Sequence, residues 1–526
     1  MDYGMTEGAK EMKFDPIKLE LYRNILNSIA EEMGVALCRS ALSTNIKERR
    51  DFSCAIFNRH GKMIAQAAHI PVHLGSMPLS VLSVIEGLGM SKGDMVILND
   101  PFRGGTHLPD ITLVAPVFIE EETPIFFVAN RAHHADVGGI TPGSMPLSTH
   151  IIQEGIRIPP IKIVGNDEIR GDVFGLLLSN VRTPEERRGD LESQISTNRI
   201  GKQRLIETSE KYGITEVSDY MNQLQEYSAR VMRQILCHLP DGSYTFSDFL
   251  DDDGIDNHPI ELCVKITIDG TEAIIDFTGS ADQVKGSMNA TYAITVSAVF
   301  YVFQCLACGD IPSNSGCLDP IEIIAPAGSI VNAQFPAAVA GGNVETSQRI
   351  VDVLLGALAK ACPDRIPAAS SGTMNNLTIG NQNYTYYETI GGGMGANPNR
   401  DGISAIQTHM TNTLNTPIES IETSYPLQVE KYRIRSNSGG AGRFRGGDGI
   451  VRSFRLLLPA QVTILSERRK FAPYGLDGGE SGETGRNTLK RNNQDIELDG
   501  KVSFTGDNED VIEIRTLGGG GFDALK

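Results

Sequence analysis

Residues 99–110 read Asn99-Asp100-Pro101-Phe102-Arg103-Gly104-Gly105-Thr106-His107-Leu108-Pro109-Asp110. An apolar run follows at residues 111–118, and a Glu-Glu-Thr-Pro turn separates it from a second apolar run at residues 125–130. The second run leads into Ala132-His133-His134-Ala135-Asp136-Val137-Gly138-Gly139. Two apolar runs joined by a short polar turn predict a β-hairpin, in which the start of the first strand lies beside the end of the second.

The predicted hairpin brings metal-type side chains together. His107 and Asp110 would face His133, His134 and Asp136 across a small gap. Imidazole and carboxylate groups together suit Zn, Mn or Fe(II). The alternative is that these side chains cap turns and satisfy loop amides. Two adjacent histidines at a strand exit are hard to explain by packing, so the pattern favours a divalent metal (Zn, Mn or Fe).

Length and charge restrict the class of protein. A chain of 526 residues is too long for one hydrophobic core and predicts several domains. A hydrophobic content of 40% and a charged content of 21% are typical of a soluble globular protein. The formal net charge of -18 disfavours binding to nucleic acid or to anionic membrane surfaces.

The sequence also predicts a location. Residues 1–14 lack the apolar core of a signal peptide. Eight cysteines in a chain of this length do not make a disulfide framework, and they fit a reducing cytoplasm. Residues 290–307 carry no charge and approach the length that spans a bilayer. Because this segment includes Tyr292, Thr295, Ser297 and Gln304, it predicts a buried helix and no membrane span.

A long amphipathic helix is expected near the N-terminus. Asp15 followed by Pro16 is typical of an N-cap with proline at the first helical position. Apolar residues recur at helical spacing up to about residue 41. The stripe that we assign to the buried face is Ile17, Leu21, Ile25, Ile29 and Met33.

Helical and strand patterns then alternate in blocks. Residues 184–239 form the longest helical region, with a break near Gly213, and residues 244–278 have a strand pattern. A helix is expected at residues 345–361, and the chain is glycine-rich and strand-like from residue 374.

These patterns predict an α+β, multidomain fold with mixed β-sheets, a long N-terminal helix and a glycine-rich, strand-rich C-terminal half. Divisions near residues 240 and 370 give three expected domains. They are an N-terminal metal-binding α+β domain (1–240), a central α+β domain (241–370) and a glycine-rich, β-rich C-terminal domain (371–526).

Several motifs make the sequence resemble the hydantoinase B/oxoprolinase family. The run at residues 98–137, which contains the predicted hairpin, is one of them. The others follow in the family's order over nearly the whole chain: Glu48-Arg49-Arg50-Asp51-Phe52-Ser53-Cys54-Ala55, Val72-His73-Leu74-Gly75-Ser76-Met77, Gly341-Gly342-Asn343-Val344-Glu345-Thr346-Ser347-Gln348-Arg349, Glu388-Thr389-Ile390-Gly391-Gly392-Gly393-Met394-Gly395-Ala396, residues 411–419, residues 438–447 and the glycine-rich end at 517–522.

The resemblance implies a divided enzyme. Members of the family are subunits or domains of ATP-dependent N-methylhydantoinases, 5-oxoprolinases, caprolactamases, and acetone or acetophenone carboxylases. A hydantoinase A-type partner with an actin-like ATPase fold uses ATP and Mg, and the B-type subunit binds a metal and hosts the later chemical step. The resemblance therefore implies a hetero-oligomer that acts on a small cyclic amide or ketone. The sequence contains no G-x-x-x-x-G-K-[ST] phosphate loop, which fits this division.

The resemblance also implies a ligand set. His107, Asp110 and His133 match the family's metal-binding His-x-x-Asp and its downstream histidine. Asp51 is the candidate fourth ligand. The neighbouring His134 is the alternative to His133 as the second imidazole ligand, so this choice stays open.

Other polar residues are candidates for catalysis or substrate binding. His134, Asp136 and Glu48 are candidates for a general base. Glu388, His409 and Asn412 lie in motifs of the resemblance, where they either bind substrate or brace loops.

The function expected from these features is the metal-binding B-type subunit of an ATP-dependent cyclic amide hydrolase of the hydantoin, 5-oxoproline or lactam type. The partner would phosphorylate the amide or enol oxygen, and this subunit would complete ring opening. Three alternatives remain: a subunit of an acetone- or acetophenone-type carboxylase, a non-catalytic scaffold for the ATPase partner, and an autonomous metallohydrolase.

Overall fold

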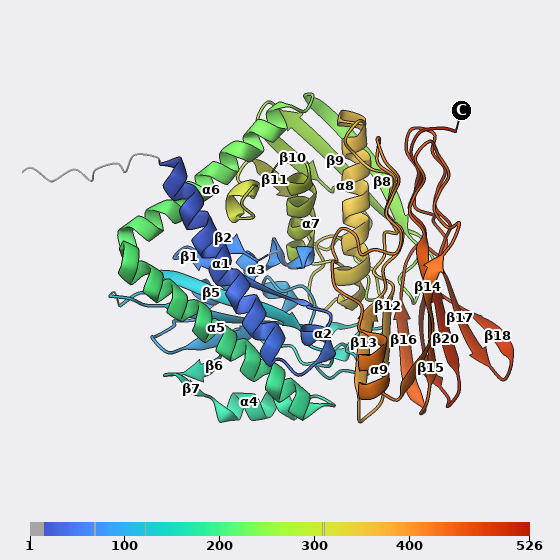
Figure 1. The fold of residues 1–526 in the computed structure, drawn as a ribbon, viewed down its shortest axis with the longest axis horizontal. Coiled ribbons are helices and arrows are strands. Elements are labelled where there is room, and N and C mark those ends of the chain that lie inside the picture. The colour runs from blue at the N-terminus through green and yellow to red at the C-terminus, as the bar shows by residue number, and fades with distance from the viewer. Residues whose placement is uncertain (1–14, 68–69, 121, 308, 310, 526) are drawn as a thin grey trace, which may run out of the picture.

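The structure is a computed structural model that describes residues 15–525 except 68–69, 121, 308 and 310. The segment 1–14, for which we expect no signal peptide, lies outside the described residues. Figure 1 shows helices and a first sheet in the N-terminal part, and further sheets of the C-terminal part beside them. The prediction of an α+β fold with several sheets is confirmed.

The N-terminal sheet has seven antiparallel strands in the order β2-β1-β5-β4-β3-β6-β7. Helices α1 (Pro16–Ser40) and α5 (Pro184–Tyr212) pack on one face, and α3 (Ser76–Gly87) packs on the other. The strands are β1 (Phe52–Asn58), β2 (Met63–Gln66), β3 (Met95–Leu98), β4 (Asp110–Val117), β5 (Phe126–His133), β6 (Ile161–Gly165) and β7 (Glu168–Ile169).

Helix α1 begins as predicted, and of the expected stripe it buries Ile29 and Met33 but not Ile17 and Leu21. The Asp15 carboxylate accepts hydrogen bonds from the N–H groups of Ile17 and Lys18, and Pro16 is the first helical residue. Ile17 is 81% exposed and Leu21 is 45% exposed, so their assignment to the buried face is wrong. With 3.6 residues per turn, steps of four drift by about 40° each. The buried series mixes steps of three and four residues: Leu19, Tyr22, Leu26, Ile29, Met33 and Leu37.

The middle of the chain builds a second, smaller sheet. After α4 (Gly171–Leu178), α5 and α6 (Ile214–Cys237) are separated at Gly213, which has a φ of +90° and ends α5 as predicted. The four strands have the order β11-β10-β9-β8, and only the β10–β11 pair is parallel. They are β8 (Gly242–Leu250), β9 (Ile260–Asp269), β10 (Glu272–Asp276) and β11 (Ile321–Ile324).

Two buried helices connect the sheets. Helix α7 (Tyr292–Cys305) packs against α3 and α8 (Ser347–Ala361), which confirms the expected buried helix. Helix α8 also lies against β8 and β9. Among the described helices, none combines the length and the low polarity that crossing a membrane requires.

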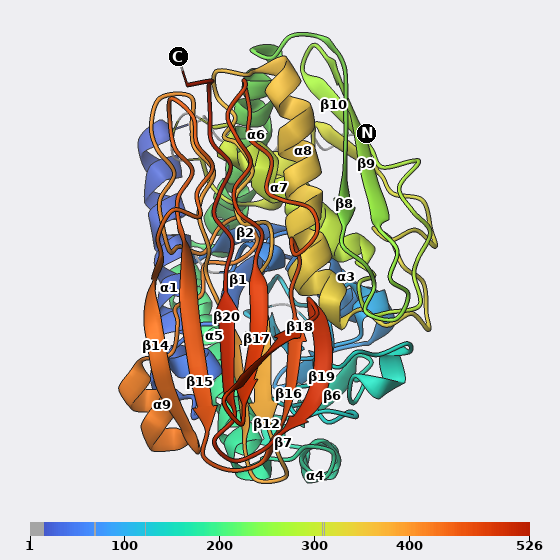
Figure 2. The same ribbon diagram turned by 90° about the vertical axis from the view of Figure 1, so that its right-hand side faces the viewer.

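The C-terminal part contains two further sheets, in the orders β13-β12-β16-β19 and β14-β15-β20-β17-β18. Figure 2 shows its glycine-rich segments as extended chains that run beyond the strand ends. These backbones approach so closely that a Cβ at Gly393 would lie 1.9 Å from the Gly447 carbonyl oxygen. The elements are β12 (Asn376–Gly380), β13 (Thr385–Thr389), α9 (Ile418–Ser424), β14 (Leu427–Arg435), β15 (Gly449–Leu456), β16 (Ala460–Leu465), β17 (Arg486–Arg491), β18 (Gln494–Leu498), β19 (Lys501–Gly506) and β20 (Val511–Arg515).

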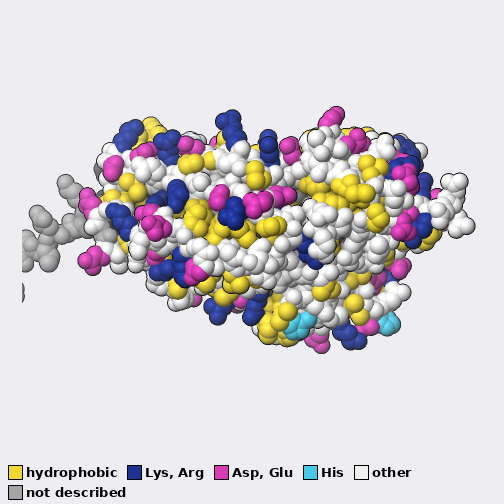
Figure 3. Space-filling model, turned by 90° about the horizontal axis from the view of Figure 1, so that it is seen from below, with side chains coloured by type: hydrophobic (Ala, Val, Ile, Leu, Met, Phe, Trp, Pro, Cys, Tyr) yellow, Lys and Arg dark blue, Asp and Glu magenta, His cyan; other side chains and the backbone are white. Residues whose placement is uncertain are grey.

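One apolar core crosses the expected domain boundaries. It joins residues of the first sheet, of α7 and α8, and of the C-terminal sheet, such as Phe57, Val299 and Leu465. The divisions near residues 240 and 370 stay predictions. On the face seen in Figure 3, basic and acidic side chains are interspersed among apolar ones.

Candidate metal centre

Three adjacent strands deliver the candidate ligands to one end of the first sheet. Asp110, the first residue of β4, is the register partner of His133, the last residue of β5. Asp51 precedes β1 on the other side of β5, and its carbonyl oxygen accepts the His133 N–H at 3.0 Å. The predicted hairpin is confirmed, and it places the start of β4 beside the end of β5.

The side chains of His107, Asp110 and His133 converge on one point. The Nε2 atom of His107, the Nδ1 atom of His133 and the Oδ1 atom of Asp110 lie 3.2 Å from one another. All three side chains are buried. Ligand bonds of about 2.0–2.2 Å put two donor atoms of a tetrahedral site roughly 3.3–3.6 Å apart, so this triangle is close to the dimensions of a metal site.

Hydrogen bonds among these groups do not satisfy all of their nitrogen and oxygen atoms. The Asn343 amide donates to Nε2 of His107 at 3.0 Å, which makes that nitrogen an acceptor. The same nitrogen faces the Asp110 carboxylate, which is also an acceptor. On the outer sides of the rings, Nδ1 of His107 and Nε2 of His133 have no described partner although both are buried. A cation at the centre of the triangle would satisfy the facing lone pairs, so the residues fit a divalent metal.

Protonation favours the same conclusion. Burial lowers the pKa of His133 below its ordinary value of 6.5, which keeps the imidazole neutral. Burial alone would raise the pKa of Asp110, but the neighbouring histidines hold it well below the ordinary value, so the carboxylate is ionised. Neutral imidazole and ionised carboxylate are the forms that bind a metal.

The second oxygen of Asp110 is held from behind. Its Oδ2 atom accepts a hydrogen bond from Thr106 Oγ1 at 2.5 Å and lies 3.4 Å from Nε2 of His73. The other ring nitrogen of His73 lies 2.8 Å from Ser53 Oγ. These contacts fix the carboxylate so that Oδ1 faces the two histidines, as outer partners of metal ligands do.

An aromatic wall closes the site. The ring of Tyr387, on β13, stacks on His133 with 4.5 Å between centroids. The Arg49 guanidinium lies 4.8 Å from the Tyr387 ring centroid and donates to Thr389 Oγ1 at 2.8 Å. The Tyr387 hydroxyl donates to Asn376 Oδ1 at 2.9 Å. A C-terminal strand thereby fixes an imidazole of the N-terminal sheet.

Asp51 lines the same small cavity as His73, Asp110 and His133. The cavity has a volume of about 20 Å³, which is enough for one water or ion. The Asp51 carboxylate lies 3.6 Å from the Arg49 guanidinium and is not part of the triangle of donor atoms.

His134 and Asp136 point away from this cavity. His134 Nε2 lies 2.9 Å from Gln194 Oε1 on α5, on the opposite face of the sheet. Asp136 pairs with Arg182 at 2.9 Å. Glu48 follows the short helix α2 (Thr44–Lys47) as its C-cap and is half-buried. None of these three candidates for a general base is among the residues that line the cavity.

The three candidate substrate ligands are also dispersed. Glu388 forms a buried ion pair with Arg452 at 3.2 Å, on the side of β13 opposite to Tyr387. His409 is half-buried, with Nδ1 3.4 Å from the Tyr301 hydroxyl. Asn412 is exposed, whereas Thr411 and Thr413 on either side of it line the cavity. The structure places these three side chains outside the immediate metal cavity.

Three residues of the centre received no role from the sequence: His73, Asn343 and Tyr387. His73 and Asn343 do occur in motifs that carry the family resemblance, which is the signal that could have singled them out. Asn343 lies in a π-helical turn (Gly342–Thr346), a rare geometry that often marks functional sites. Tyr387 lies outside these motifs, and its role depends on where β13 packs.

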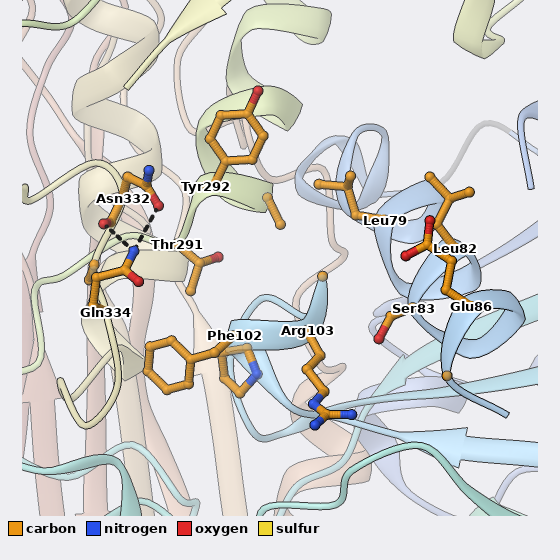
Figure 4. A pocket seen from close by; sticks show the side chains of 15 residues that line it. Leu79, Leu82, Ser83, Glu86, Phe102, Arg103, Thr291, Tyr292, Asn332 and Gln334 are labelled. Atoms are coloured by element: carbon orange, nitrogen blue, oxygen red, sulfur yellow. Dashed lines mark hydrogen bonds between the residues drawn. The ribbon is translucent and has the colours of Figure 1, made fainter. Parts of the chain in front are cut away.

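A larger open cavity of about 630 Å³ lies beyond the turn that leads to His107 (Figure 4). Phe102 and Arg103 project from the turn Pro101–Arg103, and Thr291 and Tyr292 come from the start of α7. The Thr291 hydroxyl donates to the Gly105 carbonyl oxygen at 3.2 Å, which ties this wall to the ligand loop.

The architecture around this centre is shared with known enzymes. The crystal structure of the ATP-dependent caprolactamase from Pseudomonas jessenii matches with a TM-score of 0.90 and 28% identity, over 98% of this chain and 92% of that one. The nucleotide-free structure of acetone carboxylase matches with a TM-score of 0.89 over 97% of this chain and 76% of that one. At 18% identity, the second match shows the common fold.

The sequence match is equally extensive. Residues 15–524 match the family described as hydantoinase B/oxoprolinase, and the chain belongs to that family. The 5-oxoprolinase of Dictyostelium discoideum is 43% identical over 521 residues, which are 97% of this chain. The chain spans 40% of the length of that relative.

Proposed function

We propose that this chain is the metal-binding B-type part of an ATP-dependent cyclic amide hydrolase that completes the opening of a phosphorylated substrate. The observation that carries the proposal is the buried triangle of His107, Asp110 and His133 in a member of this family. The relatives named 5-oxoprolinase and caprolactamase support a lactam or a related cyclic amide as the substrate class.

In this proposal, His107, Asp110 and His133 hold a divalent metal, and Asp51 completes the ligand set. When bound, such a metal supplies Lewis acidity, which polarises a carbon–oxygen bond and lowers the pKa of water. Thr106 and His73 orient Asp110, and Asn343 orients His107. Tyr387 fixes the His133 ring.

The same residues also exclude bulk water from the centre. Tyr387 and Arg49 are fully or almost fully buried, and the cavity that they close admits little more than one small molecule of solvent. His134 and Asp136 would support the strand end by bonding to Gln194 and Arg182, outside the reaction itself.

The nucleotide chemistry is assigned to a partner. A cyclic amide resists hydrolysis because its nitrogen is a poor leaving group, and phosphorylation of its oxygen activates it. The chain has no phosphate-loop motif for ATP. We therefore propose a hydantoinase A-type ATPase that uses ATP and Mg, in a cytoplasmic hetero-oligomer. The seven cysteines that the structure describes are free thiols, which is in line with a reducing compartment.

The proposal is tested with the chain reconstituted with an A-type partner and ATP. Product and phosphate are measured together, with 5-oxoproline or caprolactam as substrate. Asp110→Ala should abolish ring opening, while substrate-dependent phosphate release continues. The exposed Asp172→Ala is the matched control and should keep both activities. Normal product from Asp110→Ala would refute the role of the metal ligands.

Other outcomes select the alternatives. Product from a ketone plus bicarbonate, but not from a cyclic amide, would assign the chain to the carboxylases. Full activity of the pair after complete metal removal would favour a scaffold. Steady turnover by this chain without ATP or partner would favour an autonomous metallohydrolase.

A further inference from the structure

A cavity of about 540 Å³ lies directly outside the metal cavity. It opens between the last turns of α1, the start of β1 and the loop after residue 410. The residues that line it are Glu31, Gly34, Val35, Cys38, Arg39, Arg50, Phe52, Ala67, Asn412 and Leu414.

The two cavities share a wall that is one residue thick. Arg50 and Phe52 line the outer cavity, and Asp51 between them lines the metal cavity. In the facing loop, Thr411 and Thr413 line the metal cavity, whereas Asn412 lines the outer one. The Leu414 N–H donates to the Arg49 carbonyl oxygen at 3.0 Å, which joins the two halves of the wall. The backbone of residues 50–52 and of residues 411–414 therefore runs between the outer cavity and the metal cavity.

Two arginines, Arg39 and Arg50, line the outer cavity. Arg39 and Arg50 are exposed, and within the described part of the chain neither has a carboxylate within 4.0 Å. One carboxylate, Glu31, is also among the lining residues. Guanidinium groups suit carboxylate and phosphate because they donate two parallel hydrogen bonds.

The backbone at Arg50 turns its side chain to this side. Arg50 has a φ of +56°, in the left-handed region that non-glycine residues seldom adopt. The neighbouring turn is held by the Asp51 N–H, which donates to the Asn45 carbonyl oxygen at 3.0 Å. As a result Arg49 points inward against Tyr387, while Arg50 faces the outer cavity. Backbone strain of this kind persists at sites where a side chain must have one orientation.

We propose that the outer cavity binds the oxyanion of a small substrate, carboxylate or phosphate, with Arg39 and Arg50 as the donors. This inference rests on the proposed function, because it names the part of the cyclic amide or of its phosphorylated form that is recognised.

Cys38 provides a reporter for the experiment, because it lines the outer cavity. The rate of Cys38 alkylation is measured by peptide mass mapping in the full chain, without ATP or partner. The probes are 5-oxoproline, inorganic phosphate and 2-pyrrolidinone, which is the same lactam ring without the carboxylate. The exposed Cys237, at the end of α6, is the internal control.

We expect at least one anion to slow alkylation of Cys38 but not of Cys237, and 2-pyrrolidinone to have no effect. Protection by 5-oxoproline alone identifies a carboxylate site, and protection by phosphate identifies a phosphate site. Arg50→Gln should raise the half-protecting concentration at least tenfold, and Arg50→Lys less. Arg103→Gln, in the other cavity, should leave it unchanged.

The proposal is overturned if neither anion protects Cys38, if 2-pyrrolidinone protects it equally, or if protection is unchanged in Arg50→Gln. Circular dichroism checks that the variants are folded. Protection in a protein that opens no cyclic amide would contradict the proposed function and leave the anion site standing. Opening of a cyclic amide by the reconstituted protein without protection of Cys38 would support the proposed function and contradict the anion site.

Discussion

Comparing alanine variants of His133 and of its neighbour His134 distinguishes the loss of a metal ligand from the loss of a buried side chain. Both side chains are buried and follow each other at the end of β5. His133 faces Asp110, whereas His134 faces Gln194 on the other side of the sheet. His133→Ala should therefore lose the metal, and His134→Ala should keep it, although each leaves a similar cavity.

The magnitude follows from the number of donors. Structural metal sites bind with about 10–16 kcal/mol, which over four ligands is about 2.5–4 kcal/mol each. Loss of His133 should thus weaken metal binding by roughly 100- to 1,000-fold. Truncation of either buried side chain also costs folding stability, by about 2–4 kcal/mol, and this part is common to both variants. The difference between them therefore reports the metal.

The assay combines elemental analysis with competition against a chelator. In wild type and His134→Ala, EDTA should lower the denaturation midpoint, since a metal present at 100 times its dissociation constant stabilises the folded state by about 2.7 kcal/mol. EDTA should have no effect on His133→Ala. Equal metal content in both variants, or loss in His134→Ala alone, would refute the assignment.

Three further predictions rest on other contacts. Asn343→Ala removes the donor to His107 and should weaken metal binding about 10- to 100-fold in the same competition assay, while the fold is kept. Burial raises the pKa of Glu345 from 4.5 to about 8, so the folded state holds a proton that the unfolded chain releases. Stability from this group is present below pH 4.5 and is lost as the pH rises through about 8. Urea unfolding of Glu345→Gln should show a smaller loss between pH 5 and pH 8, and an unchanged pH dependence would contradict this. Calorimetric titration of the chain alone with Mg-ATP should detect no specific binding. A micromolar dissociation constant would contradict the assignment of ATP to a partner.

Local patterns were sufficient for most of the elements. The hairpin of β4 and β5, the cap of α1 at Asp15 and the break at Gly213 follow from alternation, capping chemistry and glycine, all of which act over a few residues. The buried face of α1 was predicted incorrectly at Ile17 and Leu21, because which stripe is covered depends on the partner helix and sheet.

The sequence by itself determined the candidate ligands His107 and Asp110, because their spacing and residue types are local properties of one turn. It left His133 and His134 as alternatives. Successive residues at a strand end point to opposite faces, and only the packing of α5 on one face decided which imidazole meets Asp110. Tyr387 and Asn343 were likewise decided by tertiary structure. They reach His133 and His107 from positions more than 200 residues away, and no local pattern encodes such a contact.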